Sequence, residues 1–498
     1  MTFQHLLDGA EFLSQSGNPD VTGVEYDSRR VKPGCLFVAM RGEASDGNRF
    51  IDQAIQAGAV AIVTDSPAEQ SREGVAWALV PHGRRALARI SENFYKRPAE
   101  RIAITGITGT NGKSTTAFLI EAILDAAGRK SALIGTIEYH VAGKVYPAPH
   151  TTPEALELAR LFNEAIGQGA TDAVMEVSSH ALAQQRVFGV PFDVAVFSNL
   201  TRDHLDYHKT MDEYFHAKRV LFEGCGTDPP RAVVTNLDDD YGRKLLEFSR
   251  KRSSLVLTYG WDRGDFHAQK PDITPRGTRF NLIGPHGEIA IFSPLIGRVN
   301  VYNILAAAAA CSARGCSPDA IARGIGALQH VPGRFQRVDC GQPFTVVVDY
   351  AHTDDALRNL TSLAREFVAR SGSSSRVITL FGCGGDRDRA KRPLMGEAAG
   401  RGSDFVVLTS DNPRSEDPRA IVNDALVGLQ KSGVKYAVEV DRRKAISLAI
   451  NEARPGDIVL LAGKGHEKVQ VTREGSHPFD DVEVAKEVLR VAGFDCPE

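Results

Sequence analysis

The segment Arg101–Thr116, R-I-A-I-T-G-I-T-G-T-N-G-K-S-T-T, restricts the fold of this chain more than any other stretch. It opens with a short apolar run, Ile102–Ile104, which predicts a buried strand that breaks at Gly106. After a glycine-rich turn, apolar residues at helical spacing predict a helix from Lys113 to a stop at Gly128. A strand, a glycine-rich loop and a helix in this order predict a phosphate-binding loop.

The chemistry of such a loop suits a nucleoside triphosphate. Glycines let backbone N–H groups approach phosphate oxygens, and the N-terminus of the helix adds partial positive charge. Lys113 can reach the outer phosphates, and the Ser114 hydroxyl can bind Mg²⁺. The strict pattern has glycine where Ile107 stands here. The alternative is an ordinary glycine-rich turn with a surface lysine, and the position of the predicted strand and helix disfavours it.

Length and composition indicate a soluble globular protein. A chain of 498 residues has room for about three domains, and its 42% hydrophobic and 24% charged content is ordinary. The net charge of −3 gives no reason to expect nucleic acid or an anionic membrane as a partner. The sequence shows no signal-peptide pattern and no apolar run that could span a bilayer. We therefore expect a cytoplasmic protein without membrane insertion.

The seven cysteines predict free thiols and no disulfide framework. They are scattered, odd in number and form no C-x-x-C motif, which favours reduced thiols in a cytosolic protein without a structural zinc site. They are Cys35, Cys225, Cys311, Cys316, Cys340, Cys383 and Cys496.

Alternating apolar strands and helical stretches predict an α/β protein of three domains. A smaller α/β domain is expected at residues 1–97, and a central parallel-sheet domain with the P-loop, similar to an ATPase, at 98–331. A doubly wound, Rossmann-like domain is expected at 332–498.

Polar residues follow the predicted strands at the ends where ligands bind in parallel sheets. In the central domain, the strand Asp172–Val177 carries Glu176 at its end, and the strand Val194–Phe197 is followed by a loop that contains His204. A carboxylate and an imidazole there can bind a divalent metal, so we predict a site for metal and nucleotide beside the phosphate loop.

In the last third, four apolar strands each lead into a charged or glycine-rich loop, which predicts one ligand-facing rim. The glycine run at 382–385 lacks the full dinucleotide fingerprint. The loops are D-Y-A-H at 349–352, G-C-G-G-D-R at 382–387, D-N-P-R at 411–414 and G-K-G-H-E at 463–467.

These motifs and their order resemble the Mur ligase family, ATP-dependent amide-forming ligases of peptidoglycan precursor synthesis, over essentially the whole chain. The resemblance implies transfer of meso-2,6-diaminopimelate to the γ-carboxylate of D-glutamate in UDP-N-acetylmuramoyl-L-alanyl-D-glutamate, with ATP, Mg²⁺ and an acyl-phosphate intermediate. A monomer is expected. The further motifs are T-G-T-N-G-K-S-T at 108–115, M-E-V-S-S-H at 175–180, N-L-T-R-D-H-L-D-Y-H at 199–208, A-K at 217–218, N-x-x-N at 300–303, G-R at 333–334 and A-G-K-G-H-E at 462–467.

The resemblance implies one substrate for each domain. Implied ATP contacts are Gly109, Thr110, Asn111, Gly112, Lys113, Ser114, Thr115, Asn303, Arg334 and Asp349. Implied contacts of the UDP-substrate are Tyr26, Ser28, Glu43, Ala44, Ser45, Thr151, Thr152, Ser178, Gln184 and Arg186. Implied amino-acid contacts are Arg387, Asp411, Asn412, Pro413, Arg414, Gly463 and Glu467.

The resemblance also assigns Lys218, which otherwise is a lysine in a helical stretch. It implies that CO₂ adds to this amine, giving an anionic carbamate whose oxygens suit Mg²⁺. The implied catalytic residues are Lys113, Lys218, Glu176 and His204, and the implied metal ligands are Ser114, Glu176, His204 and carbamylated Lys218. The chain departs from its relatives at Ser114, often threonine there, at Asp354, where they carry proline, and at His150, where they often carry asparagine.

We expect Arg414 to select diaminopimelate over L-lysine, because its guanidinium can bind the second carboxylate of diaminopimelate. Its alternative role is an ion pair with Glu416 or Asp417. Other functions left open are addition of L-lysine, a folylpolyglutamate-synthetase-like ligase, a P-loop phosphotransferase or motor ATPase, and a nucleotide-binding regulator without catalysis.

Overall fold

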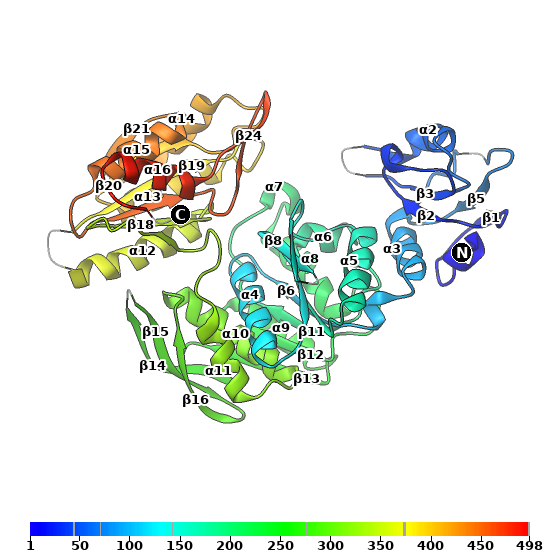
Figure 1. Cartoon of the computed structure of the whole chain (residues 1–498), viewed down its shortest axis with the longest axis horizontal. Helices are drawn as coiled ribbons and strands as arrows, with labels where there is room; N and C mark the ends of the chain where they lie inside the picture. The colour runs from blue at the N-terminus through cyan, green and yellow to red at the C-terminus, as the bar shows by residue number, and fades with distance from the viewer. Residues whose placement is uncertain (43–44, 70, 142, 275, 372–374, 497–498) are drawn as a thin grey trace.

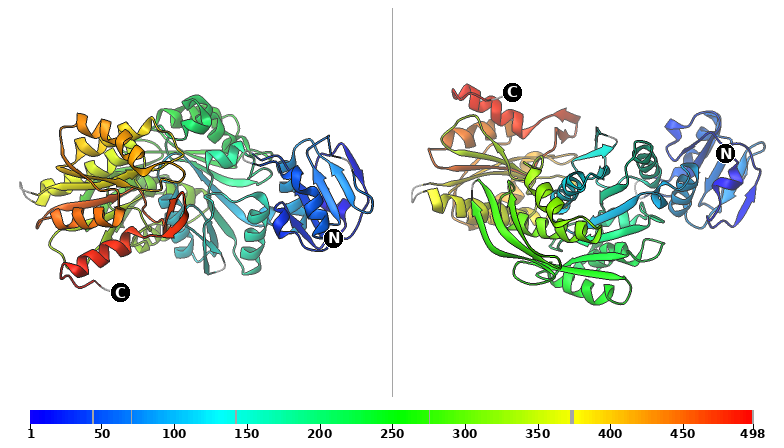
Figure 2. Two further views of the ribbon diagram at one scale, coloured as in Figure 1. Left: turned by 90° about the horizontal axis from the view of Figure 1, so that it is seen from above. Right: turned by 60° about the horizontal axis from the view of Figure 1, so that its bottom comes forward.

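The chain folds around three sheets that follow one another along the sequence (Figure 1). The computed structural model describes all residues except 43–44, 70, 142, 275, 372–374 and 497–498. The sheets have five, eleven and six strands, and a separate two-stranded hairpin lies near the C-terminus. Figure 2 shows the N-terminal sheet set apart at one end and the C-terminal sheet close to the central one. Among the described residues, no helix is long and apolar enough to cross a membrane.

The five-stranded sheet is parallel except for its first strand and has the order β1-β5-β4-β3-β2. Alternate residues of β3 face opposite sides, so that Leu36 and Val38 pack towards α3 while Phe37 and Ala39 pack towards α2. The elements are α1 (Phe3–Leu6), β1 (Ser14–Ser16), β2 (Gly23–Glu25), η1 (Ser28–Arg30), β3 (Cys35–Ala39), η2 (Gly47–Phe50), α2 (Ile51–Gln56), β4 (Ala61–Thr64), β5 (Ala76–Leu79), α3 (Gly83–Phe94) and η3 (Pro98–Glu100).

The eleven-stranded sheet has the order β16-β15-β14-β13-β12-β11-β6-β10-β7-β8-β9, with β6 between two parallel neighbours. One face packs on α4, α10 and α11, and the other on α5 and α8. Its strands are β6 (Ala103–Thr108), β7 (Ser131–Ile134), β8 (Glu138–Val141), β9 (Lys144–Pro147), β10 (Asp172–Glu176), β11 (Phe192–Phe197), β12 (Ala232–Asn236), β13 (Leu255–Gly260), β14 (Phe266–Thr274), β15 (Gly277–Gly284) and β16 (Gly287–Ser293). Its helices are α4 (Lys113–Ala126), α5 (Ala155–Gly167), α6 (Ser179–Ala183), α7 (Leu205–His208), α8 (Met211–Glu223), α9 (Asp240–Ser249), α10 (Arg298–Ala313) and α11 (Pro318–Ala327).

The prediction that the first central strand breaks at Gly106 is wrong. Strand β6 continues to Thr108, and Gly106 pairs in register with Met175 and Ala195 on its two sides. Glycine is needed there because a β-carbon would lie 2.7 Å from the ring of Phe192. The residue therefore serves close packing inside the strand, and the turn begins only at Gly109.

The six-stranded sheet has the order β17-β18-β22-β19-β20-β21 and is parallel except for β17. Helices α12, α13 and α14 cover one face, and α15 and α16 the other, as expected of a doubly wound domain. The elements are β17 (Gln336–Val338), β18 (Thr345–Asp349), α12 (Asp354–Ser371), β19 (Val377–Cys383), α13 (Lys391–Gly402), β20 (Phe405–Ser410), α14 (Pro418–Lys431), β21 (Lys435–Val438), α15 (Arg442–Glu452), β22 (Ile458–Ala462), β23 (Val469–Thr472), β24 (Gly475–Pro478) and α16 (Asp481–Val491).

The predicted α/β class with three domains is confirmed, and the sheets fall within residues 1–97, 98–331 and 332–498. The boundaries themselves stay a prediction.

The prediction of reduced thiols is wrong for two of the seven cysteines. Cys340, after β17, forms a disulfide with Cys496, after α16, across a sequence separation of 156 residues. The other five cysteines are free and buried. Sequence spacing could not reveal the bond, because the fold alone brings the chain end back to the edge strand.

Candidate active site

The shape of the loop between β6 and α4 depends on two glycines and on hydrogen bonds with Asn199. Gly109 and Gly112 have φ values of 147° and 88°, and a β-carbon on Gly109 would lie 1.9 Å from Ser198 Oγ. The loop after β11 supports it, since the Asn199 carbonyl accepts from Thr110 N at 2.8 Å and Asn199 Oδ1 accepts from Asn111 N at 2.9 Å. The loop therefore presents the N-terminus of α4 in a fixed shape.

Two lysines meet at one carbonyl oxygen of this loop. Lys113 Nζ donates to the carbonyl oxygens of Gly109 at 3.0 Å and Thr110 at 2.9 Å. Lys218 Nζ, from α8, donates to the same Gly109 oxygen at 2.9 Å and lies 4.6 Å from the centre of the Tyr214 ring. The Lys218 side chain is 2% exposed. Burial, and then the charge of Lys113, lower its pKa well below the usual value, which favours the neutral amine.

Glu176 ends β10 and is held by the loop after β7. Its Oε1 accepts from Thr136 N at 2.8 Å and its Oε2 from Thr136 Oγ1 at 2.9 Å. Burial lowers the pKa of Lys113, while the nearby carboxylates Glu176 and Asp203 act in the opposite direction. Glu176 therefore belongs to the same electrostatic neighbourhood as the phosphate loop.

His204 follows β11 in the left-handed backbone region, with φ of 53°. Its Nε2 lies 3.3 Å from Asp203 Oδ2, and its ring meets the ring of His180 edge-on at 4.8 Å. Burial lowers the pKa of His204 more than the Asp203 carboxylate raises it, so the ring is neutral. A neutral imidazole can bind a metal ion.

The donor atoms beside the phosphate loop determine whether the predicted metal site can hold Mg²⁺. In the part of the chain that the structure describes, no group of three or more His, Cys, Asp or Glu side chains is placed to hold a metal ion. The buried Ser114 hydroxyl and the Glu176 carboxylate are nevertheless oxygen donors of the kind that Mg²⁺ prefers, beside a phosphate loop. The residues fit Mg²⁺ held largely by substrate phosphates, with few protein ligands.

The C-terminal domain reaches the phosphate loop directly. Arg334 Nη2 donates to Ser114 Oγ at 3.3 Å, and Asp355 Oδ2 accepts from Asn111 Nδ2 at 3.1 Å. Asp349 holds the backbone next to Arg334, because its Oδ2 accepts from the amide of the following residue, Phe335, at 2.6 Å. The predicted nucleotide residues on the two domains therefore meet.

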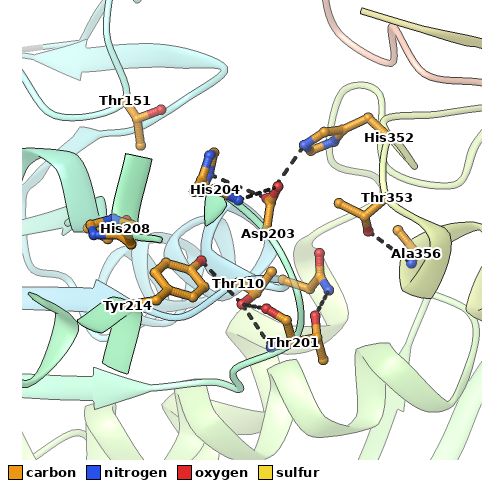
Figure 3. Close-up of polar contacts among 12 residues, drawn as sticks. Thr110, Thr151, Thr201, Asp203, His204, His208, Tyr214, His352, Thr353 and Ala356 are labelled. Carbon is orange, nitrogen blue, oxygen red and sulfur yellow. Dashed lines mark hydrogen bonds and ion pairs between the residues drawn. The ribbon is translucent and has the colours of Figure 1, made fainter. Parts of the chain in front are cut away.

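Asp203 links the same two domains, and sequence reasoning did not select it. This buried carboxylate lies 3.9 Å from His352 Nε2 and 3.7 Å from Lys391 Nζ, both from the C-terminal domain. Figure 3 shows Asp203 and His352 facing each other across the boundary, near Thr110 and Tyr214. Burial raises the pKa of Asp203, but the neighbouring His204, Lys391 and His352 and the hydrogen bond from the His204 amide together lower it below the usual range. Its position in N-L-T-R-D-H, just before His204, was the available signal.

Asn303 lies under the phosphate loop. Its Oδ1 accepts from Thr116 Oγ1 at 3.5 Å, and a β-carbon on Gly112 would lie 2.4 Å from this oxygen. Thr115 lies buried in the first turn of α4. Asn303 therefore contacts the start of α4, and its implied contact with ATP stays a prediction.

The residues expected to hold the UDP-substrate fall into two groups. Tyr26 and Ser28 follow β2 of the N-terminal sheet. Tyr26 Oη donates to Glu157 Oε2 of α5 at 3.1 Å, and Ser28 Oγ donates to Gln53 Oε1 at 3.1 Å. Ser45 is exposed to solvent. Glu43 and Ala44 lie outside the described residues.

The second group is connected by hydrogen bonds in the central domain. Thr152 Oγ1 donates to the Glu176 carbonyl at 2.9 Å and accepts from Ser178 N at 3.0 Å. Arg186 donates to the Thr152 carbonyl at 3.0 Å and to Gln184 Oε1 at 2.7 Å. Thr151 Oγ1 lies 3.1 Å from Thr136 Oγ1 and can donate to it, since the Thr136 proton goes to Glu176. The backbone carbonyl of His150 accepts from Tyr139 Oη. This group borders Glu176.

The amino-acid residues gather beyond β19, β20 and β22. Asn412 Nδ2 donates to Glu467 Oε2 at 2.7 Å, and the Gly463 amide donates to the Asp349 carbonyl at 3.0 Å. Pro413 packs against Gly385, where a β-carbon would lie 1.9 Å from the Pro413 carbonyl oxygen. Arg387 is exposed on the same rim.

Arg414 has no ion pair among the described residues. Its Nη1 donates to the Gly385 carbonyl at 2.7 Å. Glu416 pairs with Arg392 at 2.7 Å, and Asp417 caps α14 by accepting from Arg419 N at 2.9 Å. The ion pair proposed as the alternative role of Arg414 is therefore absent, and burial lowers the pKa of its guanidinium.

A phosphate loop with a buried lysine and a carboxylate beside it, reached by a doubly wound C-terminal domain, defines a three-domain α/β protein with a nucleotide site. Sequence comparison identifies it as a ligase. The Mur ligase family catalytic domain matches residues 20–95, the Mur ligase middle domain residues 107–311, and the Mur ligase glutamate ligase domain residues 333–465. The chain belongs to the Mur ligase family.

Individual relatives match almost the whole chain. The UDP-N-acetylmuramoyl-L-alanyl-D-glutamate–2,6-diaminopimelate ligase of Solibacter usitatus is 55% identical over 482 residues, which are 95% of this chain and 94% of that protein. A solved structure with the same enzyme name has a TM-score of 0.67 and 33% identity, and covers 99% of each chain. The MurF ligase of Thermotoga maritima, solved with ADP, shares the fold with a TM-score of 0.65 and 18% identity, over 95% of this chain and 97% of that one.

Proposed function

We propose that this ligase joins meso-2,6-diaminopimelate to the γ-carboxylate of the D-glutamyl residue in UDP-N-acetylmuramoyl-L-alanyl-D-glutamate, at the expense of ATP. The observation that carries the proposal is the half-buried Arg414 guanidinium, which lies on the ligand-facing rim without a carboxylate partner among the described side chains. Diaminopimelate differs from lysine by the carboxylate that such a group would bind. The 55% identical relative bears the name of this activity.

In the first step, an oxygen of the γ-carboxylate attacks the γ-phosphorus of ATP, and the bond to the ADP oxygen breaks. The products are an acyl phosphate and ADP. Two anions must approach each other, so charge neutralisation and alignment provide most of the rate enhancement. Lys113 would neutralise this charge, and the contacts of its Nζ with the phosphate-loop carbonyls support the role.

In the second step, the neutral amine of diaminopimelate attacks the acyl carbon, and phosphate leaves with the electrons of the broken C–O bond. The nitrogen then loses its extra proton, which leaves the amide. The acceptor and donor sites lie on different domains, and the contacts of Arg334 and Asp355 with the phosphate loop support their meeting.

One Mg²⁺ would be held at the phosphate loop by Ser114 and the substrate phosphates, and a second by Glu176 and His204 together with a carbamate on Lys218. Bound there, the ions would neutralise phosphate charge. Carbamylation is supported by the burial of Lys218, which favours the neutral amine, and by its shared acceptor with Lys113, because adding CO₂ to that amine puts an anion beside the Lys113 ammonium.

The domain roles complete the proposal. Residues 1–97 would hold the UDP-sugar through Tyr26, Ser28 and Ser45, with the peptide end at the group from Thr151 to Arg186. Residues 98–331 would hold ATP, and residues 332–498 the amino acid. All these residues belong to one chain, so a monomer suffices, and substrates of this kind place the reaction in the cytoplasm.

The test is ADP release in the presence of ATP, Mg²⁺ and the UDP-muramoyl dipeptide, with candidate amino acids added singly. Rapid ADP release with meso-diaminopimelate and little with L-lysine is expected, because a site built for a polar group rejects an analogue that lacks it by about 10⁴-fold. Equal use of L-lysine would overturn the assignment of the amino acid.

A further inference from the structure

A lysine at the centre of the amino-acid loops has no role in the chemistry described so far. Lys464 follows β22, and its side chain is completely buried, with 0% exposure. A buried ammonium is costly unless hydrogen bonds and opposite charges compensate it. The partners of Lys464 therefore show what it is for.

Those partners come from two loops that are not neighbours in the sheet. Lys464 Nζ donates to Asn412 Oδ1 at 3.0 Å and to Glu467 Oε2 at 3.1 Å, and lies 3.6 Å from Asp411 Oδ1. Strand β19 lies between β20, which leads to Asp411, and β22, which leads to Lys464. One ammonium group thus joins the two loops across the end of β19.

The ammonium also fixes the orientation of the neighbouring side chains. Asn412 Oδ1 accepts from both Lys464 Nζ and Val471 N, so the other end of the amide, Nδ2, faces Glu467 and donates to Oε2. Glu467 Oε2 therefore accepts two hydrogen bonds, while Oε1 accepts none from the described residues. This leaves one carboxylate oxygen of Glu467 for a ligand.

We infer that Lys464 is a positioning residue that holds Asn412 and Glu467 ready for the far end of the incoming amino acid. The inference rests on the proposed function. Asp411, Glu467 and Lys464 together carry one net negative charge, which suits a single ligand ammonium. Without Lys464, the charge becomes −2 beside Arg414. Such a site favours an amino acid whose far end carries only an ammonium group, as in L-lysine, over diaminopimelate, whose far end also carries a carboxylate.

The experiment compares Lys464→Met, which keeps the length and removes the charge, with Lys468→Met. Lys468 is 69% exposed and pairs with Asp480, so its variant is the matched control. In Lys464→Met the KM for diaminopimelate should rise about 10- to 100-fold, because hydrogen bonds to charged groups are lost. The KM values for ATP and the UDP-substrate should stay within about twofold, and the preference for diaminopimelate over L-lysine should fall. An unchanged amino-acid KM would overturn the inference.

A double-mutant cycle with Glu467→Gln separates positioning from general stability. If Lys464 acts through Glu467, Lys464→Met should raise the KM for diaminopimelate far less in the Glu467→Gln enzyme than in the wild-type enzyme. Strictly additive losses would mean that Lys464 does not act through Glu467. Should circular dichroism show that Lys464→Met does not fold, Lys464→Gln takes its place in both assays.

The wild-type substrate is established first, which keeps the two proposals apart. No turnover with diaminopimelate overturns the proposed function. The role of Lys464 is overturned only if its variants keep the wild-type KM for whichever amino acid the wild-type enzyme uses.

Discussion

At the scale of single residues, the phosphate loop is organised around the Gly109 carbonyl oxygen, which accepts from both Lys113 and Lys218. Two ammonium groups on one acceptor repel each other, and burial of Lys218 adds to the cost of its charge. The arrangement therefore favours a neutral Lys218, the form that reacts with CO₂. The burial of Lys218 and its shared acceptor with Lys113 could not be read from the sequence, where Lys218 is only a lysine in a helical stretch.

Lys218→Arg should be as inactive as Lys218→Ala. Arginine keeps the positive charge but cannot form the carbamate, so a carbamate role predicts loss of at least about 100-fold in turnover for both variants. Steady-state rates are measured beside thermal unfolding, which shows whether each variant is folded. A folded Lys218→Arg enzyme with normal turnover would favour a simple cationic role instead.

Arg414→Ala should raise the KM for diaminopimelate steeply and leave the KM values for ATP and the UDP-substrate nearly unchanged. Removing one partner of a buried charge pair typically costs about 2–5 kcal/mol. Arg419, which is exposed on the first turn of α14, provides the control variant Arg419→Ala. Kinetics with each substrate varied in turn give the answer, and an unchanged diaminopimelate KM would remove Arg414 from the site.

At the scale of elements, the sequence predicted the strand ends well, except that of β6, because parallel strands covered on both faces are continuous apolar runs. Glu176, His204 and the loops after β19, β20 and β22 all lie at such ends. Strand order depends on pairing between distant segments. Local patterns therefore gave no sign that β14, β15 and β16 extend the central sheet, or that Asp203 would meet His352.

His140 connects the phosphate-loop helix to the β8–β9 hairpin and should make stability depend on pH. Its ring lies between Glu121 of α4, at 2.8 Å, and Glu138 of β8, at 2.9 Å. Burial opposes protonation, but hydrogen bonds and charges from the two carboxylates raise the pKa of His140 to about 9. Burial also raises the pKa of Glu121, which offsets part of the gain.

A raised histidine pKa means that the stabilisation is fully present below the unfolded value near 6.5 and is lost as the pH rises through about 9. His140→Gln should therefore lower the free energy of unfolding by about 1–3 kcal/mol at pH 6 and by much less at pH 10. Denaturant unfolding of both proteins at the two pH values measures this. A difference that is equal at both pH values would contradict the ionic role.

At the scale of the whole molecule, polar contacts join the three domains, together with apolar side chains such as Leu156, in the N-terminal core, and Ile296, in the C-terminal core. Arg334 and Asp355 connect the C-terminal domain to the phosphate loop, whereas Tyr26 and Arg84 connect the N-terminal sheet to Glu157 and Glu154 of the central domain. Figure 2 shows how far the N-terminal sheet extends from the rest. Interfaces between the domains of one chain permit relative movement unless they are large and hydrophobic.

Binding of the UDP-substrate with a nonhydrolysable ATP analogue should make the protein more compact, because the proposed reaction needs groups from all three domains together. Small-angle X-ray scattering with and without the two ligands measures the radius of gyration. Each ligand added alone serves as the control. A radius that is the same in all four conditions would contradict closure.

The disulfide has a consequence for the topology of the chain. Because Cys340 and Cys496 are joined, nearly the whole C-terminal third is a covalent ring, and a single protease cut within it would leave both fragments attached until a reductant is added. Electrophoresis of nicked protein with and without dithiothreitol would reveal the ring. Val338, just before Cys340, pairs with Val346 near the start of β18. The disulfide therefore lies near the N-terminal ends of the parallel strands, whereas the ligand-facing rim lies at their C-terminal ends. Opening the ring would therefore change how a damaged molecule comes apart and leave the substrate contacts in place.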